Sequence, residues 1–435
     1  MAMRGSRTAL LCAAVTGAGL LTAGAANAAD GYFAHGYGMQ AAGRGGAAIA
    51  FTSDAFGGAN NPATIAWVGN RFEVGLSVLQ GIRGAKREGS VGGGIADYNE
   101  TSDRHYFEVP EMAFSRQVSD RYGWGVAMYA NGGMNTTYHD NTLPEAACDP
   151  SSTSMERNRN AFCGTGRLGL NLMQVIIAPT FAYKLTPKMS VGIAPLFGVQ
   201  AWKLYGLDSF KPLSSAPDSL TNRGNDFAFG YGARVGYYYR PLPWLNLGAQ
   251  YSTRVYMTPF SRYKGLFADA GRFDIPQNYG VGIMVSPVPE LRIGLDWQRI
   301  DYSKVASNGN LPNVSPANLL GSHDGPGFHW SSVNAYKFGI EAWPESRVTL
   351  RFGYNHSTQV INRDAVTFNI LAPGVAQDHV TVGFTWRFGK GSEINGYYLR
   401  WFSHSLAGPS ILPFGGTETL RMHMNALGVG YAVSF

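Results

Sequence analysis

The sequence predicts an all-β fold: a transmembrane antiparallel β-barrel of about 14 strands with an N-terminal plug in its lumen. Four observations carry this prediction. Apolar residues alternate with small or polar ones from residue 71 onward, and short connections alternate with long ones. Charged residues make up 15% of the chain, against about 25% in typical soluble domains. After Ala29, no apolar run is long enough for a spanning helix.

The first 28 residues have the three parts of a secretory signal peptide. The basic start "MAMRGSR" precedes the apolar run "TALLCAAVTGAGLLTAG", and "ANA" supplies small residues for cleavage before Ala29. A membrane anchor is the competing interpretation, but glycines interrupt this run, which is shorter than the roughly 20 residues of a spanning helix. We therefore expect residues 1–28 to direct export.

Residues 71–435 are predicted to form the barrel wall. The end of the chain, "NALGVGYAVSF", places large apolar residues on one face of a strand and alanine, glycine or serine on the other. A soluble sandwich would alternate in the same way, so the connections decide between the two folds. Short turns such as "LTPKM", "SPVPE" and "FGKGS" alternate with long polar connections, as in outer-membrane barrels with short periplasmic turns and long external loops.

Two cysteines remain after export, Cys148 and Cys163, in the polar stretch "CDPSSTSMERNRNAFC". An exported chain meets an oxidising compartment, so we expect them to form a disulfide. The alternative, two free thiols, stays open because the spacing by itself is not specific.

Residues 29–70 are predicted to be a plug, or hatch. Side chains alone cannot fill the lumen of a barrel of this size, which must therefore hold water or a plug. This stretch lacks strand alternation and is rich in glycine and alanine. Gly43, Gly45 and Gly46 let the backbone approach the wall closely, and Asn61 with Pro62 favours a turn.

The stretch "GRGGAAIAFTSDAFGGANNPA" resembles the hatch of the FadL-type outer-membrane channels for long-chain fatty acids and other hydrophobic compounds. The Asn-Pro-Ala motif of that hatch corresponds to Asn61, Pro62 and Ala63, and Arg44 lies in the Gly-Arg-Gly-Gly run. A second stretch, "RYGWGVAMYANGGMNTTYHD", is similar to the third strand of the family, whose kink would fall at Asn131, Gly132 and Gly133. The stretch "LGLNLMQVIIAPTFAYKL" resembles the fourth strand less strongly. The third external loop departs from the family because it is mostly polar, which puts an external capture groove in doubt.

The resemblance implies passive uptake of hydrophobic molecules, either long-chain fatty acids or aliphatic and aromatic hydrocarbons. Ligand would enter from outside, bind above the hatch and leave sideways through the kinked third strand when Asn61, Pro62 and Ala63 shift. A long alkyl chain gains about 0.8 kcal/mol per methylene in hydrocarbon, which favours exit into the bilayer over exit into water. Arg234, Arg351 and Arg387 face inward by parity and could bind a ligand carboxylate or pair with carboxylates across the lumen.

No catalytic, cofactor-binding or metal-binding signature rises above chance in the sequence, so we expect neither an enzyme nor a cofactor. No Lys/Arg cluster resembles a nucleic-acid footprint. We expect a monomer in the outer membrane of a Gram-negative bacterium, surrounded by lipid and lipopolysaccharide, with Phe435 recognised by the barrel-assembly machinery. The alternatives are a hydrophilic or substrate-specific porin, and a surface adhesin or receptor barrel.

Overall fold

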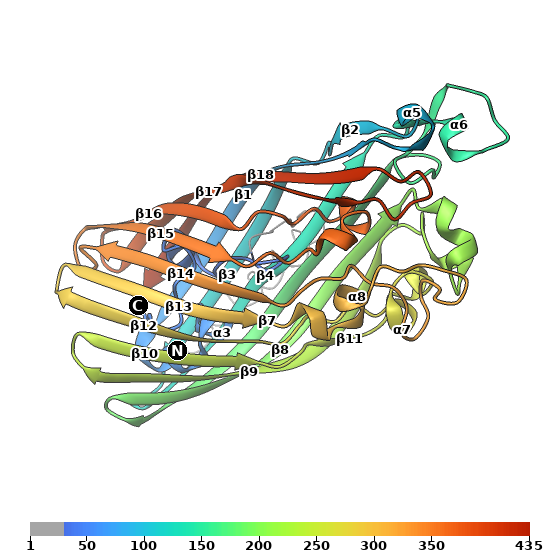
Figure 1. The fold of residues 1–435 in the computed structure, drawn as a ribbon. Helices are drawn as coiled ribbons and strands as arrows, with labels where there is room; N and C mark the ends of the chain where they lie inside the picture. The colour runs from blue at the N-terminus through green and yellow to red at the C-terminus, as the bar shows by residue number, and fades with distance from the viewer. Residues whose placement is uncertain (1–29) are drawn as a thin grey trace, which may run out of the picture.

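The computed structural model describes residues 30–435, most of which form one antiparallel sheet that closes on itself (Figure 1). The first wall strand pairs with the last, and all neighbours along the wall are antiparallel. The fourteen wall strands are β1 (Arg71–Glu88), β3 (Tyr106–Gln117), β4 (Tyr122–Tyr138), β7 (Leu168–Thr186), β8 (Met189–Tyr205), β9 (Asp226–Leu242), β10 (Leu245–Ser252), β12 (Asn278–Val288), β13 (Leu291–Ile300), β14 (Val333–Ala342), β15 (Val348–Ser357), β16 (Asp378–Phe388), β17 (Ser392–Pro409) and β18 (Thr417–Ser434). The predicted barrel and its number of strands are confirmed; the predicted signal peptide, residues 1–28, lies outside the described residues.

Short turns join the strands at one end of the barrel and long connections join them at the other (Figure 1). We call these the periplasmic end and the external end. Short strands in the connections are β2 (Tyr98–Thr101), β5 (Leu143–Pro144), β6 (Arg157–Arg159) and β11 (Tyr256–Met257). Helical turns in the external connections are α5 (Val91–Gly94), α6 (Glu145–Cys148), η2 (Asp208–Leu213), η3 (Pro217–Ser219), η4 (Ser261–Tyr263), α7 (Ala268–Gly271), η5 (Tyr302–Lys304), α8 (Ala306–Gly309), η6 (Arg363–Ala365) and η7 (Phe368–Ile370).

The outer face of the wall is apolar. Along β18, Leu427, Val429 and Tyr431 are 65%, 56% and 41% exposed, whereas Ala426 and Ala432 on either side of this stretch are buried. Such a continuous apolar surface is a liability in water and is what a hydrocarbon-facing barrel requires. Within residues 30–435, we find no helix that is both long and apolar enough to cross a membrane.

Residues 30–70, which we call the N-terminal segment, pack within the ring of strands (Figure 1). Its helical turns are α2 (Met39–Gly43), α3 (Gly57–Asn60), η1 (Pro62–Thr64) and α4 (Ile65–Val68). The first contacts β15 to β18, whereas η1 contacts β7 to β9, so the segment reaches wall strands far apart in the sheet order. This placement agrees with the predicted hatch.

The external connections fold over the lumen with their apolar side chains inward. Cys148 and Cys163 form the predicted disulfide, with Cα atoms 5.4 Å apart. Phe162, beside that bond, is buried with its ring 5.8 Å from the ring of Phe210 and 6.5 Å from that of Phe368. In the structure this loop, residues 139–167, is the second external connection and not the third, because it joins β4 to β7. It is polar in composition, yet it contributes an apolar side chain to the core at the external end.

Candidate functional site

The wall has an interruption between β3 and β4. β3 pairs with β1 from Tyr106 to Ser115, but it pairs with β4 only from Met112, opposite Met128, to Gln117. Beyond that point β4 continues to pair with β7 on its other side up to Tyr138. Backbone hydrogen bonds with β4 resume when Asp103 N donates to the Thr137 carbonyl over 2.9 Å. We call the unpaired part of the wall, between Met128 and Thr137 of β4, the window.

A β-bulge lies inside the window. The register of β4 against β7 shifts between Ala130 and Gly132, which leaves Asn131 as the extra residue. Its side chain is buried, and Nδ2 donates to Gln174 Oε1 over 3.0 Å. The predicted kink is therefore present, and the bulge turns Asn131 toward the lumen.

The beginning of the N-terminal segment covers the window. Phe33 forms an antiparallel bridge with Gly132, and Ala34 N donates to the Asn131 carbonyl over 3.1 Å. Tyr37 Oη donates to Asn131 Oδ1 over 3.1 Å, and its ring lies 4.4 Å from that of Tyr129. Unpaired strand edges are not tolerated against lipid, so these contacts have a physical reason: they supply partners that β3 does not provide.

The two glycines of the kink face different ways. A Cβ on Gly132 would lie 1.7 Å from the Tyr32 carbonyl oxygen, so the N-terminal segment can approach only because this residue is glycine. Gly133 is opposite Met173, on the outer face of β7. The sequence alone did not assign different orientations to Gly132 and Gly133.

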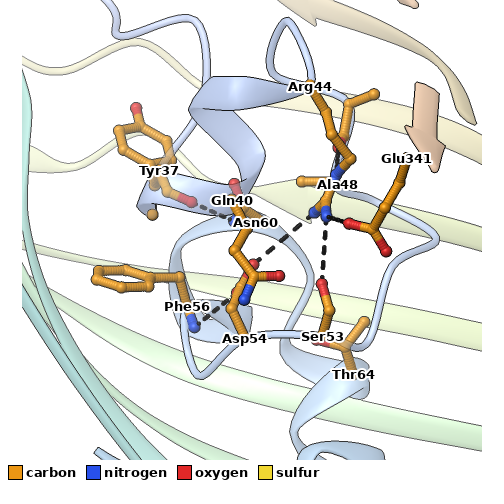
Figure 2. A network of polar contacts seen from close by, with 12 residues as sticks. Tyr37, Gln40, Arg44, Ala48, Ser53, Asp54, Phe56, Asn60, Thr64 and Glu341 are labelled. Atoms are coloured by element: carbon orange, nitrogen blue, oxygen red, sulfur yellow. Dashed lines mark hydrogen bonds and ion pairs between the residues drawn. The ribbon is translucent and has the colours of Figure 1, made fainter. Parts of the chain in front are cut away.

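Arg44 anchors the middle of the N-terminal segment to the wall (Figure 2). Its guanidinium lies 2.9 Å from Glu341 Oε2 on β14 and 3.8 Å from Asp54 Oδ2, and Nη1 donates to Ser53 Oγ over 3.3 Å. The guanidinium also stacks 4.0 Å from the ring centroid of Phe51. Burial, with Glu73 nearby, raises the pKa of Asp54 to about 6.

Gly43, Gly45 and Gly46 fit tightly against the wall. Thr381 Oγ1 donates to the Gly43 carbonyl over 3.0 Å and accepts from Gly45 N over 2.9 Å. Gly46 has φ 88°, and a Cβ there would lie 1.8 Å from the His35 carbonyl oxygen. These contacts agree with the predicted close approach of backbone to backbone.

Asn61, Pro62 and Ala63 dock on the other side of the lumen. Asn61 Nδ2 donates to the Ile49 and Tyr237 carbonyls over 2.8 and 3.0 Å, and Oδ1 accepts from Ala63 N. The wall offers glycines where the motif rests: a Cβ on Gly192 would lie 2.4 Å from Pro62 C, and one on Gly236 would lie 2.0 Å from Asn61 Oδ1. This dock involves β8 and β9, so the structure does not bring the motif to the window.

The three arginines predicted as carboxylate contacts are dispersed and have other partners. Arg234 Nη1 donates to the Gly58 carbonyl over 3.0 Å and also to that of Ala59. Arg351 Nε lies 2.7 Å from Glu341 Oε2, and Arg387 Nε lies 3.5 Å from Glu393 Oε2. Arg351 and Arg387 are thus paired with carboxylates, but each carboxylate lies directly opposite on the adjacent strand and not across the lumen.

Sequence reasoning missed Arg83 on β1. Its side chain is buried, with the guanidinium carbon 4.6 Å from the ring centroid of Phe107, and its Nη2 donates to the Arg104 carbonyl. Nε has no hydrogen-bond partner, and no acidic side chain within residues 30–435 forms an ion pair with it. By contrast Arg87, four residues further along β1 on the same face, is paired with Glu418 over 2.6 Å. The parity of β1 would have placed Arg83 inward, but not shown that it lacks a carboxylate.

Arg83 borders a small apolar cavity of about 20 Å³ beside the window. The other lining side chains that matter here are Tyr32, Met134, Trp330, Met422 and Met424. Flexible methionines and a broad indole suit an apolar ligand of variable shape. The cavity thus combines an apolar lining with one cation that lacks an anionic partner.

Comparison with known proteins agrees with this architecture. A sequence model of the family described as "Outer membrane protein transport protein (OMPP1/FadL/TodX)" matches residues 14–405. The fold is similar to that of the toluene transporter TodX of P. putida (16% identity, TM-score 0.65, 92% of this chain and 99% of that one). It is also similar to the toluene transporter TbuX of Ralstonia pickettii (17%, 0.61, 92% and 99%) and to a Pseudomonas aeruginosa FadL homologue (14%, 0.64, 95% and 100%). A search of curated protein sequences finds no match.

Proposed function

From the premise that this chain belongs to the OMPP1/FadL/TodX family of outer-membrane transport proteins, we propose that it takes up hydrophobic molecules passively and releases them sideways through the window. The family consists of transport channels for hydrophobic substrates. The observation that carries the proposal is the unpaired stretch between β3 and β4, which the N-terminal segment covers from inside.

The geometry supports a gate made of residues 30–37. These residues bind β4 through one backbone hydrogen bond, one bridge and the Tyr37 hydroxyl, which are few contacts beside the continuous ladders of the wall. Withdrawal must also break the ion pair of Asp30 with Lys337 on β14, 3.3 Å long, and the hydrogen bonds of Tyr302 with the backbone of residues 30–33. Withdrawal of this stretch would open the window without breaking any strand pair of the barrel. A solute leaving there enters hydrocarbon, where each methylene is about 0.8 kcal/mol more favourable than in water.

The passage is tested by filling the window from the lipid side. Gly133→Trp adds a large side chain at the outer face of the window and should abolish most uptake of a labelled long-chain fatty acid or alkane. Val126→Trp is the matched control, because Val126 lies on the same strand where β4 pairs with both β3 and β7. Heat-modifiable migration on gels verifies that both variants fold.

The control should take up solute like the wild type. Normal uptake by a folded Gly133→Trp protein would show that solute leaves elsewhere, for example straight into the periplasm. Single-channel recording separates the porin alternative: the wild type should conduct poorly, and a large steady ion current would favour a hydrophilic pore.

Arg83 narrows the substrate class to a fatty acid or a related amphipathic acid. A buried cation without a counter-charge is costly, and a carboxylate entering beside it supplies the missing partner. The cavity of about 20 Å³ has room for about one water, so its flexible methionine side chains would move apart to admit the start of the alkyl chain. The likeness to toluene transporters does not argue against this, because at 16–17% identity it establishes the fold alone.

Arg83→Met should weaken binding of a long-chain fatty acid about tenfold or more, since hydrogen bonds to charged groups contribute roughly 1.5–3 kcal/mol. Binding of an alkane of the same length should change little. Arg83→Lys keeps the charge and should retain most of the affinity for the acid. Equal effects of Arg83→Met on acid and alkane would contradict the assignment and favour a neutral hydrocarbon substrate.

A further inference from the structure

The outer face of β4, β7, β8 and β9 carries a hollow of about 1080 Å³ near the external end. We propose that this hollow binds the lipid A part of lipopolysaccharide, with the acyl chains on an apolar floor and a phosphate group between Arg104 and Lys203. This assignment goes beyond the uptake of solutes, and the two stand independently.

The strand register arranges the outward-facing residues of the floor in rows that run across the wall. Met173, Ala201 and Phe227 form one row of paired residues, and Val175, Val199 and Phe229 form the next row toward the periplasmic end. Parity places all of them on the outer face, where Phe227 and Phe229 are 44% and 59% exposed. Because the side chain of Ala201 is smaller than those of its neighbours, it leaves a depression at the centre of the floor. The floor is therefore an apolar groove suited to acyl chains.

The row on the external side of the floor is polar. Asn135 pairs with Asn171, which in turn pairs with Lys203, and Asn135 Nδ2 donates to Asn171 Oδ1 over 3.0 Å. Tyr205, one position further out on the same face, lies with its ring centroid 5.6 Å from Lys203 Nζ. The change from apolar to polar therefore takes place between two adjacent rows.

This change falls at the expected height of the outer membrane surface. At the periplasmic end, an outward row contains Tyr122, Tyr183 and Tyr237 with Val191 between the last two. Such aromatic rows mark the interface of outer-membrane barrels, and a tilted strand crosses the apolar band in about 10 residues. Counting that distance along β8 from Val191 reaches Ala201, so Lys203 lies at the level of the outer head groups.

The rim of the hollow has an excess of positive charge. Arg104, Arg167 and Lys203 line it, and Asp103 is the one acidic residue among its lining residues. Asp103 forms an ion pair with Arg167. Arg104 and Lys203 are exposed, and within residues 30–435 neither is paired with an acidic side chain. Two exposed cations above an apolar groove are complementary to a phosphorylated lipid with several acyl chains.

Lipid A is the occupant that fits this combination, because it is the phosphorylated, multiply acylated lipid of the outer leaflet of this membrane. A bound molecule would lie beside the window, since Met128 and Asn135 of β4 and the Asp103–Arg104 stretch that ends the window belong to the hollow. Its acyl chains would thus border the place where the wall is interrupted.

The test uses purified full-length barrel in mild detergent, with hexa-acylated, bis-phosphorylated lipid A as the probe and native mass spectrometry as the readout. The wild type should retain one lipid A. Arg104→Ala with Lys203→Ala should weaken binding about 30-fold, if each basic side chain contributes what one contributes near an anionic membrane surface. The matched control is Arg272→Ala with Arg363→Ala, which removes two exposed charges from external connections outside the hollow.

Two further arms keep the proposal falsifiable. Ala201→Trp fills the floor without changing charge and should also reduce lipid A binding, which simple electrostatic attraction would not predict. Lipid A without phosphates, and phosphatidylethanolamine, should bind the wild type much more weakly. Equal retention by the Arg104/Lys203 variant and the control, or equal binding of phosphorylated and dephosphorylated lipid, would overturn the assignment.

Discussion

Tyr37→Phe removes one hydroxyl from the contact between the N-terminal segment and the window. In the structure this hydroxyl donates to Asn131 Oδ1 over 3.1 Å, and Tyr37 and Asn131 are both buried. The ring itself is kept, so its packing against Tyr129 should persist. The substitution therefore tests whether the polar contact at the bulge holds the segment in place.

The expected change in free energy follows from the buried acceptor that the substitution leaves without a donor. Within residues 30–435, Oδ1 of Asn131 accepts from no other donor, so it becomes a buried acceptor without a partner. Leaving such a group unsatisfied costs roughly 1–3 kcal/mol. The contact is broken when the segment withdraws, and water then solvates Asn131. We therefore expect the withdrawn state to become roughly 5- to 150-fold more populated relative to the covered state.

Amide hydrogen exchange of residues 30–37 measures that population directly, and uptake of a labelled solute should rise with it if withdrawal limits the flux. Tyr263→Phe is the control: Tyr263 is also buried and its Oη donates to the Gly224 carbonyl over 2.6 Å, but it lies in an external connection. Exchange in residues 30–37 that is the same in Tyr37→Phe, Tyr263→Phe and the wild type would refute the reasoning.

Two further predictions concern the external loop and the pH response. Replacing Cys148 and Cys163 with serine should make the external loop 139–167 cleave faster with protease while the barrel stays heat-modifiable; a cross-link closing 15 residues contributes about 3 kcal/mol in the chain-entropy model. Burial raises the pKa of Asp54 to about 6 and lowers that of His35 to about 3. As pH falls from 7 to 5, docking of the middle of the N-terminal segment should therefore gain about 1 kcal/mol from Asp54, and docking of residues 30–37 should lose about 2 kcal/mol from His35. Compared with the wild type, Asp54→Asn should make amide exchange around residue 54 faster at pH 5 relative to pH 7. His35→Gln should make amide exchange of residues 30–37 slower at pH 5 relative to pH 7.

The fold was predictable from the sequence because a barrel wall obeys simple rules. Each strand has a period of two, and lipid requires a uniformly apolar outer face, so the pattern of stretches such as 426–435 indicates wall strands. Alternation of connection lengths then excluded the sandwich. The disulfide was also predictable, because an exported chain with two remaining cysteines can form only one intramolecular pair.

The candidate site was predictable only in part. Paired glycines indicated the kink in β4. The window, however, depends on β3 ending its pairing with β4 at Met112, and no residue pattern predicts where that pairing ends. Likewise, parity turns arginines inward without saying which of them meet a carboxylate. Arg87 and Arg83 are both inward on β1, and only the three-dimensional structure shows that Glu418 reaches one and not the other.

The contacts of the N-terminal segment also distinguish the residues that fix it to the wall from those that can move. Asn61 is bonded to the wall at Tyr237, and the two wall glycines beneath the motif leave no space for it to slide without a backbone clash. Arg44 fixes the middle of the segment to β14 through a buried ion pair. Residues 30–37 are bridged or hydrogen-bonded to β4 only through Phe33, Ala34 and Tyr37. Other polar contacts of this stretch, the Asp30–Lys337 ion pair and hydrogen bonds with Tyr302, involve β14 and an external connection. We infer that the Asn-Pro-Ala motif is the anchor of the segment and that residues 30–37 are its moving part. Pro62→Ala should therefore affect uptake less than Tyr37→Phe, and the reverse order would place the gate at the motif.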